Sequence, residues 1–205
     1  MTAISAVKEP FDRDRQFSAK RKSVILAAAQ AFRRQGYHNT NMAAIADALD
    51  LTRPALYYYV KNKEEILYES HLIAYDAMDD ILARPRGANQ SGLDQLYDVF
   101  YAFVLLLTDS GVSLLTDVGS LTGAWKSDVL KRRALIEDQV AKLVKRGQKD
   151  GSIRQSDPRM MVFFFMGALN WLNAWYDPSG KRTGPEIAES FAQQMKNGLM
   201  SGQEN

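Results

Sequence analysis

The segment TNMAAIADALDLTRPALYYYVKNK, at residues 40–63, decides how this chain of 205 residues folds. Apolar residues recur at helical spacing after Thr40, which is suited to cap a helix that ends near residue 49. Thr52 is suited to cap a second helix, over residues 52–60, whose first turn tolerates Pro54 because its amides have no helical partner. The segment therefore predicts two short helices joined by a tight turn at residues 50–51.

The second of these helices has two different faces. Leu56, Tyr59 and Val60 share one side by their spacing, and we expect them to pack on the rest of the domain. The other side carries aromatic and basic groups without an acid. An aromatic core stripe at residues 57–59 is the alternative, but three consecutive helical residues cannot all face one core. The outer face is typical of a helix that enters the major groove of DNA.

Each residue type on that face suits a particular DNA contact. A tyrosine donates a hydrogen bond to phosphate and packs its ring on a sugar or a thymine methyl group. Arg53, at the leading end, can reach O6 and N7 of guanine, with a phosphate contact as the alternative. Helix starts offer free amides to a phosphate, and lysines neutralise flanking phosphates. The candidate DNA-binding residues are Thr40, Thr52, Arg53, Pro54, Ala55, Tyr57, Tyr58, Lys61 and Lys63.

Charge is distributed unevenly along the chain. Residues 1–63 contain 11 Lys and Arg against 5 Asp and Glu, whereas residues 64–205 contain 15 against 19. A basic N-terminal part suits contact with a polyanion, although an ordinary charged surface is the alternative. Cysteine is absent, which fits a reducing compartment, and neither a secretory signal nor an apolar run long enough to cross a bilayer is evident. We therefore expect a soluble, cytoplasmic protein.

Helical periodicity continues along the chain, and no segment alternates convincingly as a strand does. Residues 1–17 are expected to be a flexible arm, residues 18–66 a three-helix DNA-binding head, and residues 67–205 a body made of a helical bundle. The predicted fold class is all-α, with about nine helices. These helices are expected at residues 18–35, 40–49, 52–60, from 62 to the loop at 84–92, 93–108, 112–118, 126–146, 159–176 and 186–200.

Several short motifs occur in order: Gly36-Tyr37-x-x-Thr40, Ile45-Ala46, Leu51-Thr52 and LYYYVKNKEEIL at residues 56–67. Together they resemble the N-terminal domain of the TetR family of bacterial transcriptional repressors, over residues 20–68. One departure is Asp50, where that family usually has glycine, but aspartate tolerates the left-handed conformation better than most residues. The resemblance implies a homodimer on a palindromic DNA operator, released when a ligand binds the body, which also carries the dimer interface.

Apolar side chains dominate the body and allow two interpretations. They form the core of a helical bundle, or some of them line a cavity for a small hydrophobic effector. Asn170, on an otherwise apolar helix, is the candidate polar anchor for such a ligand, with a hydrogen bond between helices as the alternative. The candidate effector-binding residues are Phe100, Phe103, Val104, Leu107, Leu121, Trp125, Phe163, Asn170 and Trp171.

Residues 167–188 resemble, more weakly, the C-terminal part of TetR-like regulators of fatty-acid, branched-chain and sterol catabolism, in which acyl-CoA thioesters act as effectors. The resemblance makes an acyl-CoA the leading effector. Such a ligand needs basic residues at the cavity mouth, and Lys131, Arg132 and Arg133 or the basic residues at 142–146 could supply them, unless they form a solvated helix face. The sequence predicts no cofactor and no metal site.

The last predicted helix carries an apolar residue every four positions. This stripe, together with an aromatic residue of the preceding helix, supplies the candidate dimer-interface residues: Trp175, Ile187, Phe191, Met195 and Leu199. Two helices from each protomer would then form a two-fold four-helix bundle. The alternative is that the stripe packs only on its own body.

The sequence argues against an enzyme. His38 and His71 are its only histidines, and neither lies near an Asp and Ser arrangement suited to nucleophilic catalysis. A non-specific DNA-coating protein would need basic residues along its whole length, and the basic and apolar stripes do not coincide as a membrane-surface helix requires. Within the same fold, an activator or a regulator of multidrug efflux is the alternative to a repressor.

Overall fold

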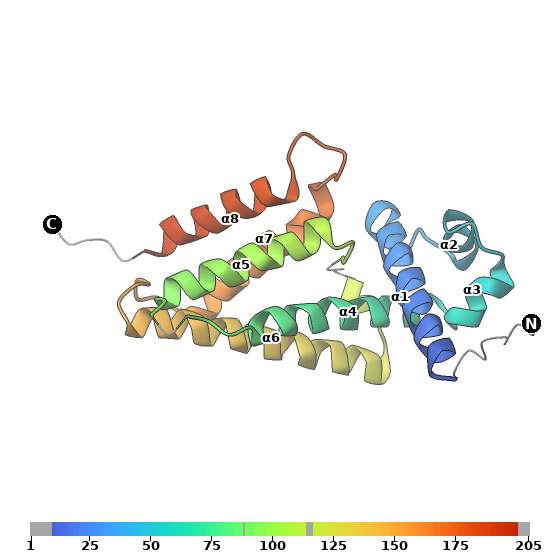
Figure 1. Ribbon diagram of the computed structural model, residues 1–205, viewed down its shortest axis with the longest axis horizontal. Helices are drawn as coiled ribbons and strands as arrows, with labels where there is room; N and C mark the ends of the chain where they lie inside the picture. The colour runs from blue at the N-terminus through green and yellow to red at the C-terminus, as the bar shows by residue number, and fades with distance from the viewer. Residues whose placement is uncertain (1–9, 88, 114–116, 201–205) are drawn as a thin grey trace, which may run out of the picture.

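The computed structural model describes residues 10–87, 89–113 and 117–200, and this part of the chain is all-α, as predicted, without a β-strand (Figure 1). It contains eight α-helices and one short 3-10 helix. The elements are α1 (Pro10–Gln35), α2 (Met42–Ala48), α3 (Arg53–Tyr59), α4 (Lys63–Ala83), α5 (Gly92–Asp109), η1 (Asp117–Ser120), α6 (Gly123–Lys149), α7 (Pro158–Trp175) and α8 (Gly184–Leu199).

Helix α1 begins at Pro10, so the prediction of a flexible arm is wrong for residues 10–17. Proline suits the first turn of a helix because its fixed φ is already helical and its missing N–H has no partner to lose. Phe17 then packs on the rings of Tyr58 and Tyr59, which gives the early turns of α1 a contact that helical periodicity alone could not show. Residues 1–9 lie outside the described part of the chain.

The helix predicted over residues 112–118 is also not found in that form. Residues 112–113 are not helical, residues 114–116 lie outside the described part, and a 3-10 helix covers Asp117–Ser120. Helix α6 begins at Gly123, three residues before its predicted start at 126.

The head is built around a small core shared by its three helices. Ile25 and Phe32 of α1, Ile45 of α2 and Leu56 of α3 are buried together with residues of the following helix. Asp50, in the turn between α2 and α3, has φ of 52°, so the expected left-handed conformation is confirmed. This turn sets the angle between α2 and α3 and points the outer face of α3 away from the core.

Helix α4 joins the head to the body as one continuous element of 21 residues (Figure 1). Asn62 caps it, because its side-chain oxygen accepts a hydrogen bond from the amide of Glu65 at 2.7 Å. In the body, α5 packs against α4, α6, α7 and α8 and is the central helix. The start of α5 approaches the end of α6 so closely that a Cβ atom on Gly92 would lie 2.2 Å from the backbone nitrogen of Gly147.

The last two helices start where the sequence indicates. Asp157 caps α7, and Thr183 forms a reciprocal capping box with Glu186 at the start of α8. Among the described residues, none of the helices combines the length and the hydropathy needed to cross a bilayer.

Candidate functional site

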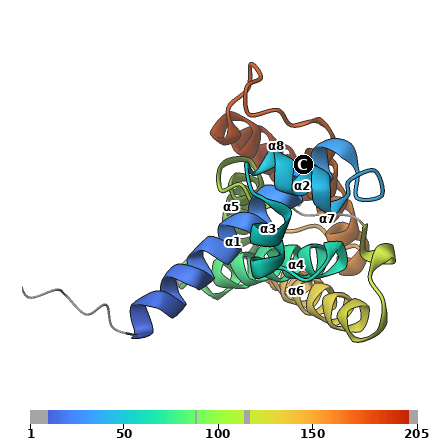
Figure 2. The same cartoon turned by 90° about the vertical axis from the view of Figure 1, so that its right-hand side faces the viewer.

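Helix α3 lies at the end of the molecule opposite the body and exposes the face predicted to read DNA (Figures 1 and 2). Tyr57 and Arg53 are exposed, and Tyr58 keeps 69% of its surface accessible. Leu56 is fully buried and Tyr59 is half-buried, so the inner face also matches the prediction. The geometry leaves a basic and aromatic helix face free to meet another molecule.

The start of α3 keeps part of its polar capacity available. The Oγ1 atom of Thr52 accepts a hydrogen bond from the amide of Ala55 at 3.3 Å, which leaves the hydroxyl proton free to donate outward. Thr52 and Pro54 are exposed, Ala55 is half-buried, and Lys61 is exposed just beyond the end of the helix. These residues surround the same surface as the tyrosines.

Two of the nine candidate DNA-binding residues are not placed as predicted. Thr40 is buried, with its hydroxyl donating to the carbonyl oxygen of Gly36 at 2.9 Å, so it faces the core rather than DNA. Asn41 is the residue that caps α2, because its Oδ1 accepts a hydrogen bond from the amide of Ala44 at 2.9 Å. Threonine and asparagine are both good N-caps, and the sequence prediction was wrong by one position.

Lys63 is the second residue whose placement differs. Its Nζ donates to the carbonyl oxygens of Tyr37 at 2.9 Å and Thr40 at 3.0 Å, and it lies 4.2 Å from the centre of the Tyr37 ring. The ammonium group is therefore occupied inside the head, where it holds the link between α1 and α2 to the start of α4. We remove Lys63 and Thr40 from the candidate DNA contacts and add the exposed Asn41.

Arg21 of α1 connects three helices of the head, and sequence reasoning missed it. Its guanidinium donates to the carboxylates of Glu65 and Glu69 on α4, both at 2.9 Å, and to the carbonyl oxygen of Tyr59 at 3.0 Å. The hydrogen bond to Glu69 is the main reason that the pKa of Arg21 is raised above its usual value. This network fixes the end of α3 relative to α1 and α4.

Polar contacts hold the head to the body. Arg33 donates to the carbonyl oxygen of Tyr176 at 2.8 Å. The carboxylate of Glu64 accepts both the amide and the hydroxyl of Thr122, at 2.7 and 2.8 Å. Thr122 precedes α6, and its hydroxyl binds Glu64 rather than an amide of its own helix. The start of α4 is thus tied to the start of α6.

Most of the predicted effector-binding residues lie in the packed core. Trp125 is half-buried, and its ring stacks on Tyr68 with centroids 5.3 Å apart and planes inclined by 12°. Apart from the three candidates on α7, the remaining effector-binding candidates are fully buried among their neighbours: Phe100, Phe103, Val104, Leu107 and Leu121. Their placement matches the interpretation as bundle core.

The three candidate effector residues on α7 face outward, which contradicts their prediction as a cavity lining. Phe163 and Asn170 are exposed, and Trp171 keeps 66% of its surface accessible. Asn170 is therefore not a buried amide in need of a partner. Large apolar residues lie on every side of α7, so the sequence did not reveal which side packs; the buried side is Met161, Val162, Phe165, Met166, Leu169 and Leu172.

The stripe predicted to form the dimer interface on α8 also packs differently. Ile187, Met195 and Leu199 are buried against the protein's own body, where α8 lies along α5. Phe191 is half-buried with its ring 6.1 Å from that of the exposed Trp175. The alternative, that the α8 stripe packs on its own body, is the arrangement observed for those three residues.

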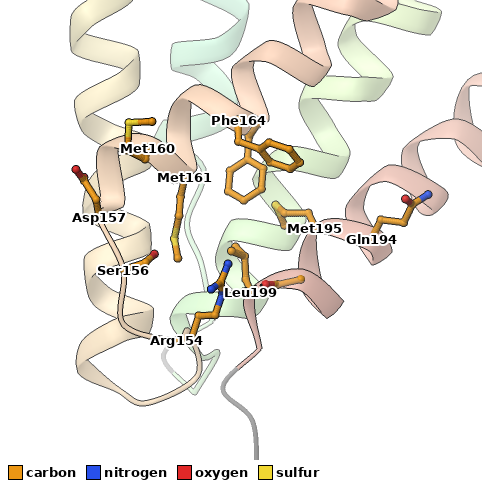
Figure 3. Close-up of a pocket in the computed structure, with 11 residues that line it drawn as sticks. Arg154, Ser156, Asp157, Met160, Met161, Phe164, Gln194, Met195 and Leu199 are labelled. Atoms are coloured by element: carbon orange, nitrogen blue, oxygen red, sulfur yellow. Dashed lines mark hydrogen bonds between the residues drawn. The ribbon is translucent and has the colours of Figure 1, made fainter.

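Large apolar side chains instead lie exposed along one side of α7. We call this set the α7 face: Met160, Phe163, Phe164, Trp171 and Trp175. It continues into a groove of about 430 Å³ that is lined by Met160 and Phe164 from α7 and by Met195 and Leu199 from α8 (Figure 3). An exposed apolar surface of this kind marks an interaction site.

His71 on α4 is a further residue that the sequence did not single out. It is completely buried, and neither ring nitrogen has a hydrogen-bond partner among the described residues. Burial, with a smaller effect from the positive charge of Arg133, lowers the pKa of His71 from 6.5 to about 4. The imidazole is therefore neutral in the folded protein near neutral pH.

Comparisons with known proteins match both parts of the chain. A family model described as bacterial regulatory proteins, tetR family, matches residues 24–69. A second model, described as a tetracyclin repressor-like C-terminal domain, matches residues 89–199, more than half of the chain. The first match agrees closely with the range of the predicted resemblance.

Curated relatives are transcriptional regulators. The negative regulator IcaR of the biofilm operon icaADBC in Staphylococcus epidermidis is 27% identical over 52% of this chain, and the match spans 57% of that protein. The regulator RutR of Escherichia coli O157:H7 is 28% identical over 77% of this chain and 76% of its own length. The prediction that the chain is not an enzyme agrees with these matches.

Solved structures share the fold. AibR in complex with isovaleryl coenzyme A and operator DNA superposes with a TM-score of 0.71 and 24% identity, covering 88% of this chain and 97% of AibR. The ketosteroid regulator KstR2 of Mycobacterium tuberculosis has a TM-score of 0.74 and 18% identity, covering 89% and 96%.

Proposed function

Because the chain belongs to the TetR family of bacterial transcriptional regulators, we propose that it is a ligand-responsive repressor that binds a palindromic operator as a homodimer. The observation that carries this proposal is the outer face of α3, where Arg53, Tyr57 and Tyr58 are exposed beside a buried Leu56. In this proposal the DNA-binding domain extends from Pro10 to residue 66. Residues 67–205 bind the ligand and form the dimer. The protein acts in the cytoplasm.

Specific contacts follow from the residue types on that surface. Arg53 reads a guanine from the start of α3, while Tyr57 and Tyr58 contact phosphate, sugar or a thymine methyl group. Thr52, Pro54 and Ala55 bring the start of the helix close to the backbone, and Lys61 and Asn41 flank it. Each recognition helix enters one of two successive major grooves, whose centres are about 34–36 Å apart.

The second protomer binds the α7 face. Phe164 and Trp171 on this face are more than half exposed, and its side chains are continuous with the apolar groove between α7 and α8. A dimer closed through α7 and the outer side of α8 covers both, as a two-fold four-helix bundle. This interface keeps the helices predicted from the sequence but moves the contact residues from the α8 stripe to the α7 face.

An acyl-CoA thioester is the proposed effector. Support comes from AibR, which shares the fold and whose structure contains isovaleryl coenzyme A, and from the resemblance of residues 167–188 to acyl-CoA-responsive regulators. Because Phe103 and Val104 are tightly buried, the effector has to bind a form of the body in which α5 and its neighbours separate. Stabilising that form shifts the population away from the head spacing that fits DNA.

The test is binding of a fluorescent duplex from the promoter of the protein's own gene. Arg53→Ala removes one bidentate base contact from each of the two half-sites, so the dimer is expected to lose roughly a hundredfold or more in affinity. Arg182→Ala, an exposed arginine of the body, is the matched control and should bind as the wild type does. Equal binding to the promoter and to random duplex, unchanged by Arg53→Ala, would reject the function.

The effector arm of the same assay adds acyl-CoA thioesters of increasing chain length to the complex. Release by a thioester, but not by free coenzyme A at the same concentration, supports the proposed effector because both carry the same phosphates. Release by neither limits the proposal to DNA binding and excludes acyl-CoA as the effector.

A further inference from the structure

The first turns of α1 extend beyond the core of the head. From residue 13 onward, where burial is described, Val24 is the first buried residue of the helix, yet α1 is already helical from Pro10. Between Arg13 and Lys20 every side chain except Phe17 is exposed. We call this segment, residues 13–20, the α1 extension; Figure 2 shows that it projects to one side of the other head helices.

Phe17 fixes the α1 extension beside the recognition helix. Its ring meets that of Tyr58 edge to face, with centroids 5.3 Å apart, and stacks on Tyr59 at 5.5 Å. Tyr58 is more exposed than Tyr57 on the surface proposed to meet DNA, and Arg21, one turn after Phe17, binds the carbonyl oxygen of Tyr59. Aromatic pairs and this hydrogen bond give the extension a defined direction.

Helical geometry determines which basic residues share the side of Phe17. At about 100° per residue, Arg13 and Lys20 lie roughly 40° and 60° to one flank of Phe17. The opposite flank of Phe17 carries Asp14 and Arg21. This flank faces α4, because Arg21 and Ile25 line a hollow together with Glu69 of α4. The flank of Arg13 and Lys20 therefore lies across Phe17 from α4.

Arg15 and Lys22 supply a natural comparison. They lie roughly 160° and 140° from Phe17 around the helix, so they point away from α3. Both are exposed, and neither lies on the flank of α1 that is next to the outer face of α3. Removal of either pair changes the net charge of the protein by the same amount.

We propose that the α1 extension is a second DNA-binding element, in which Arg13 and Lys20 each bind a phosphate beside the major groove that α3 enters. Phe17 is a positioning residue that holds both side chains next to Tyr58. Arg13 begins only about 6 Å from Phe17 along the helix axis, so its side chain reaches a strand that Tyr58 touches. The inference rests on the proposed DNA-binding function and adds contacts outside the helix-turn-helix.

The experiment measures operator affinity as a function of salt concentration for the wild type and three variants: Arg13→Ala/Lys20→Ala, Arg15→Ala/Lys22→Ala and Phe17→Ala. Because the proposed dimer carries two copies of each residue, the first variant loses four phosphate contacts, which is expected to reduce the slope of log K against log salt by about 4, with at least a tenfold lower affinity at low salt. The second variant keeps the wild-type slope. Phe17→Ala, which retains both charges, should lose affinity in the same direction as the first variant.

A shortened operator gives an independent readout. Removing the base pairs that flank the recognition-helix sites should weaken wild-type binding but leave Arg13→Ala/Lys20→Ala unchanged, because that variant has no contact left to lose. Equal slopes for the two double variants, while Arg53→Ala still loses binding, would overturn the inference and leave the proposed function intact. A wild-type protein that does not prefer its operator overturns both.

Discussion

The Nε atom of Arg21 donates a hydrogen bond to the carbonyl oxygen of Tyr59 at a distance of 3.0 Å and so joins the first helix to the last residue of the recognition helix. The same guanidinium binds the carboxylates of Glu65 and Glu69. Both carboxylates are largely covered, so they depend on Arg21 to balance their charge. The position of α3 therefore depends on a residue that touches neither the turn nor the exposed tyrosines.

Arg21→Leu should lower the free energy of unfolding by about 1–2 kcal/mol, because the partners of Arg21 lose their hydrogen bonds while solvent still screens them in part. Urea unfolding measures this change. Lys22→Leu, at the exposed neighbouring position, should stay within about 0.5 kcal/mol of wild type. If both variants unfold at the same urea concentration as the wild type, the network does not stabilise the head.

Phe164→Glu and Trp171→Glu should each convert the proposed dimer to monomers in analytical ultracentrifugation. A carboxylate placed in a buried apolar contact loses its hydration without gaining a partner, which is strongly unfavourable. Leu135→Glu is the matched control, because Leu135 on α6 is 50% exposed but lies outside the α7 face. Variants of Phe164 and Trp171 that remain as dimeric as Leu135→Glu would show that the α7 face is not the interface.

His71 should make the protein less stable in acid. The unfolded chain takes up a proton at this residue below about pH 6.5, whereas the folded protein does so only near pH 4. The free energy of unfolding should therefore fall by roughly 3 kcal/mol between those values, with no further loss from this residue at lower pH. Urea unfolding at pH 7 and pH 4.5 measures this change. The decrease in the free energy of unfolding between the two pH values should be smaller in His71→Gln than in the wild type, whereas His38→Gln, at an exposed position, should show the full decrease.

Asp50 should tolerate only residues that accept a left-handed backbone. With φ of 52°, Asp50→Val is expected to lower the free energy of unfolding by about 1–2 kcal/mol, since a β-branched side chain collides with its own carbonyl there. Asp50→Asn is the control and should remain close to wild type in thermal denaturation. A valine variant as stable as the asparagine variant would mean that the turn rearranges.

The sequence predicted the helix-turn-helix well because its information is local. Caps, the position of Leu56 and the run of tyrosines fix two short helices and their outer face without reference to distant residues. Thr40 and Asn41 show the limit of that information, since both residue types cap helices and only the packing of Thr40 against Gly36 decides between them. Lys63 shows another limit, because its charge is visible in the sequence but its two carbonyl partners are not.

The body could be predicted only as a class of fold. Phe163, Phe164 and Phe165 are equally apolar, yet Phe165 alone of the three is buried. Periodicity cannot orient a helix whose sides are all apolar, so the effector residues predicted on α7 were misplaced. On α8 the apolar stripe is evident from the sequence, but its spacing does not say whether it packs on its own body or on a second protomer. The contact that orders the start of α1 was missed for a related reason: Phe17 finds its partners about 40 residues away, on α3.

Helix α4 acts mechanically as a lever, because it is a single rigid rod of 21 residues with the head at one end and the body along its length. Such a rod is about 30 Å long, so a tilt of about 5° around its far end displaces Lys63 by roughly 3 Å. In a two-fold pair the two displacements add. A rearrangement small enough to leave most of the core packing unbroken would thus suffice to move two recognition helices out of step with the grooves of a duplex.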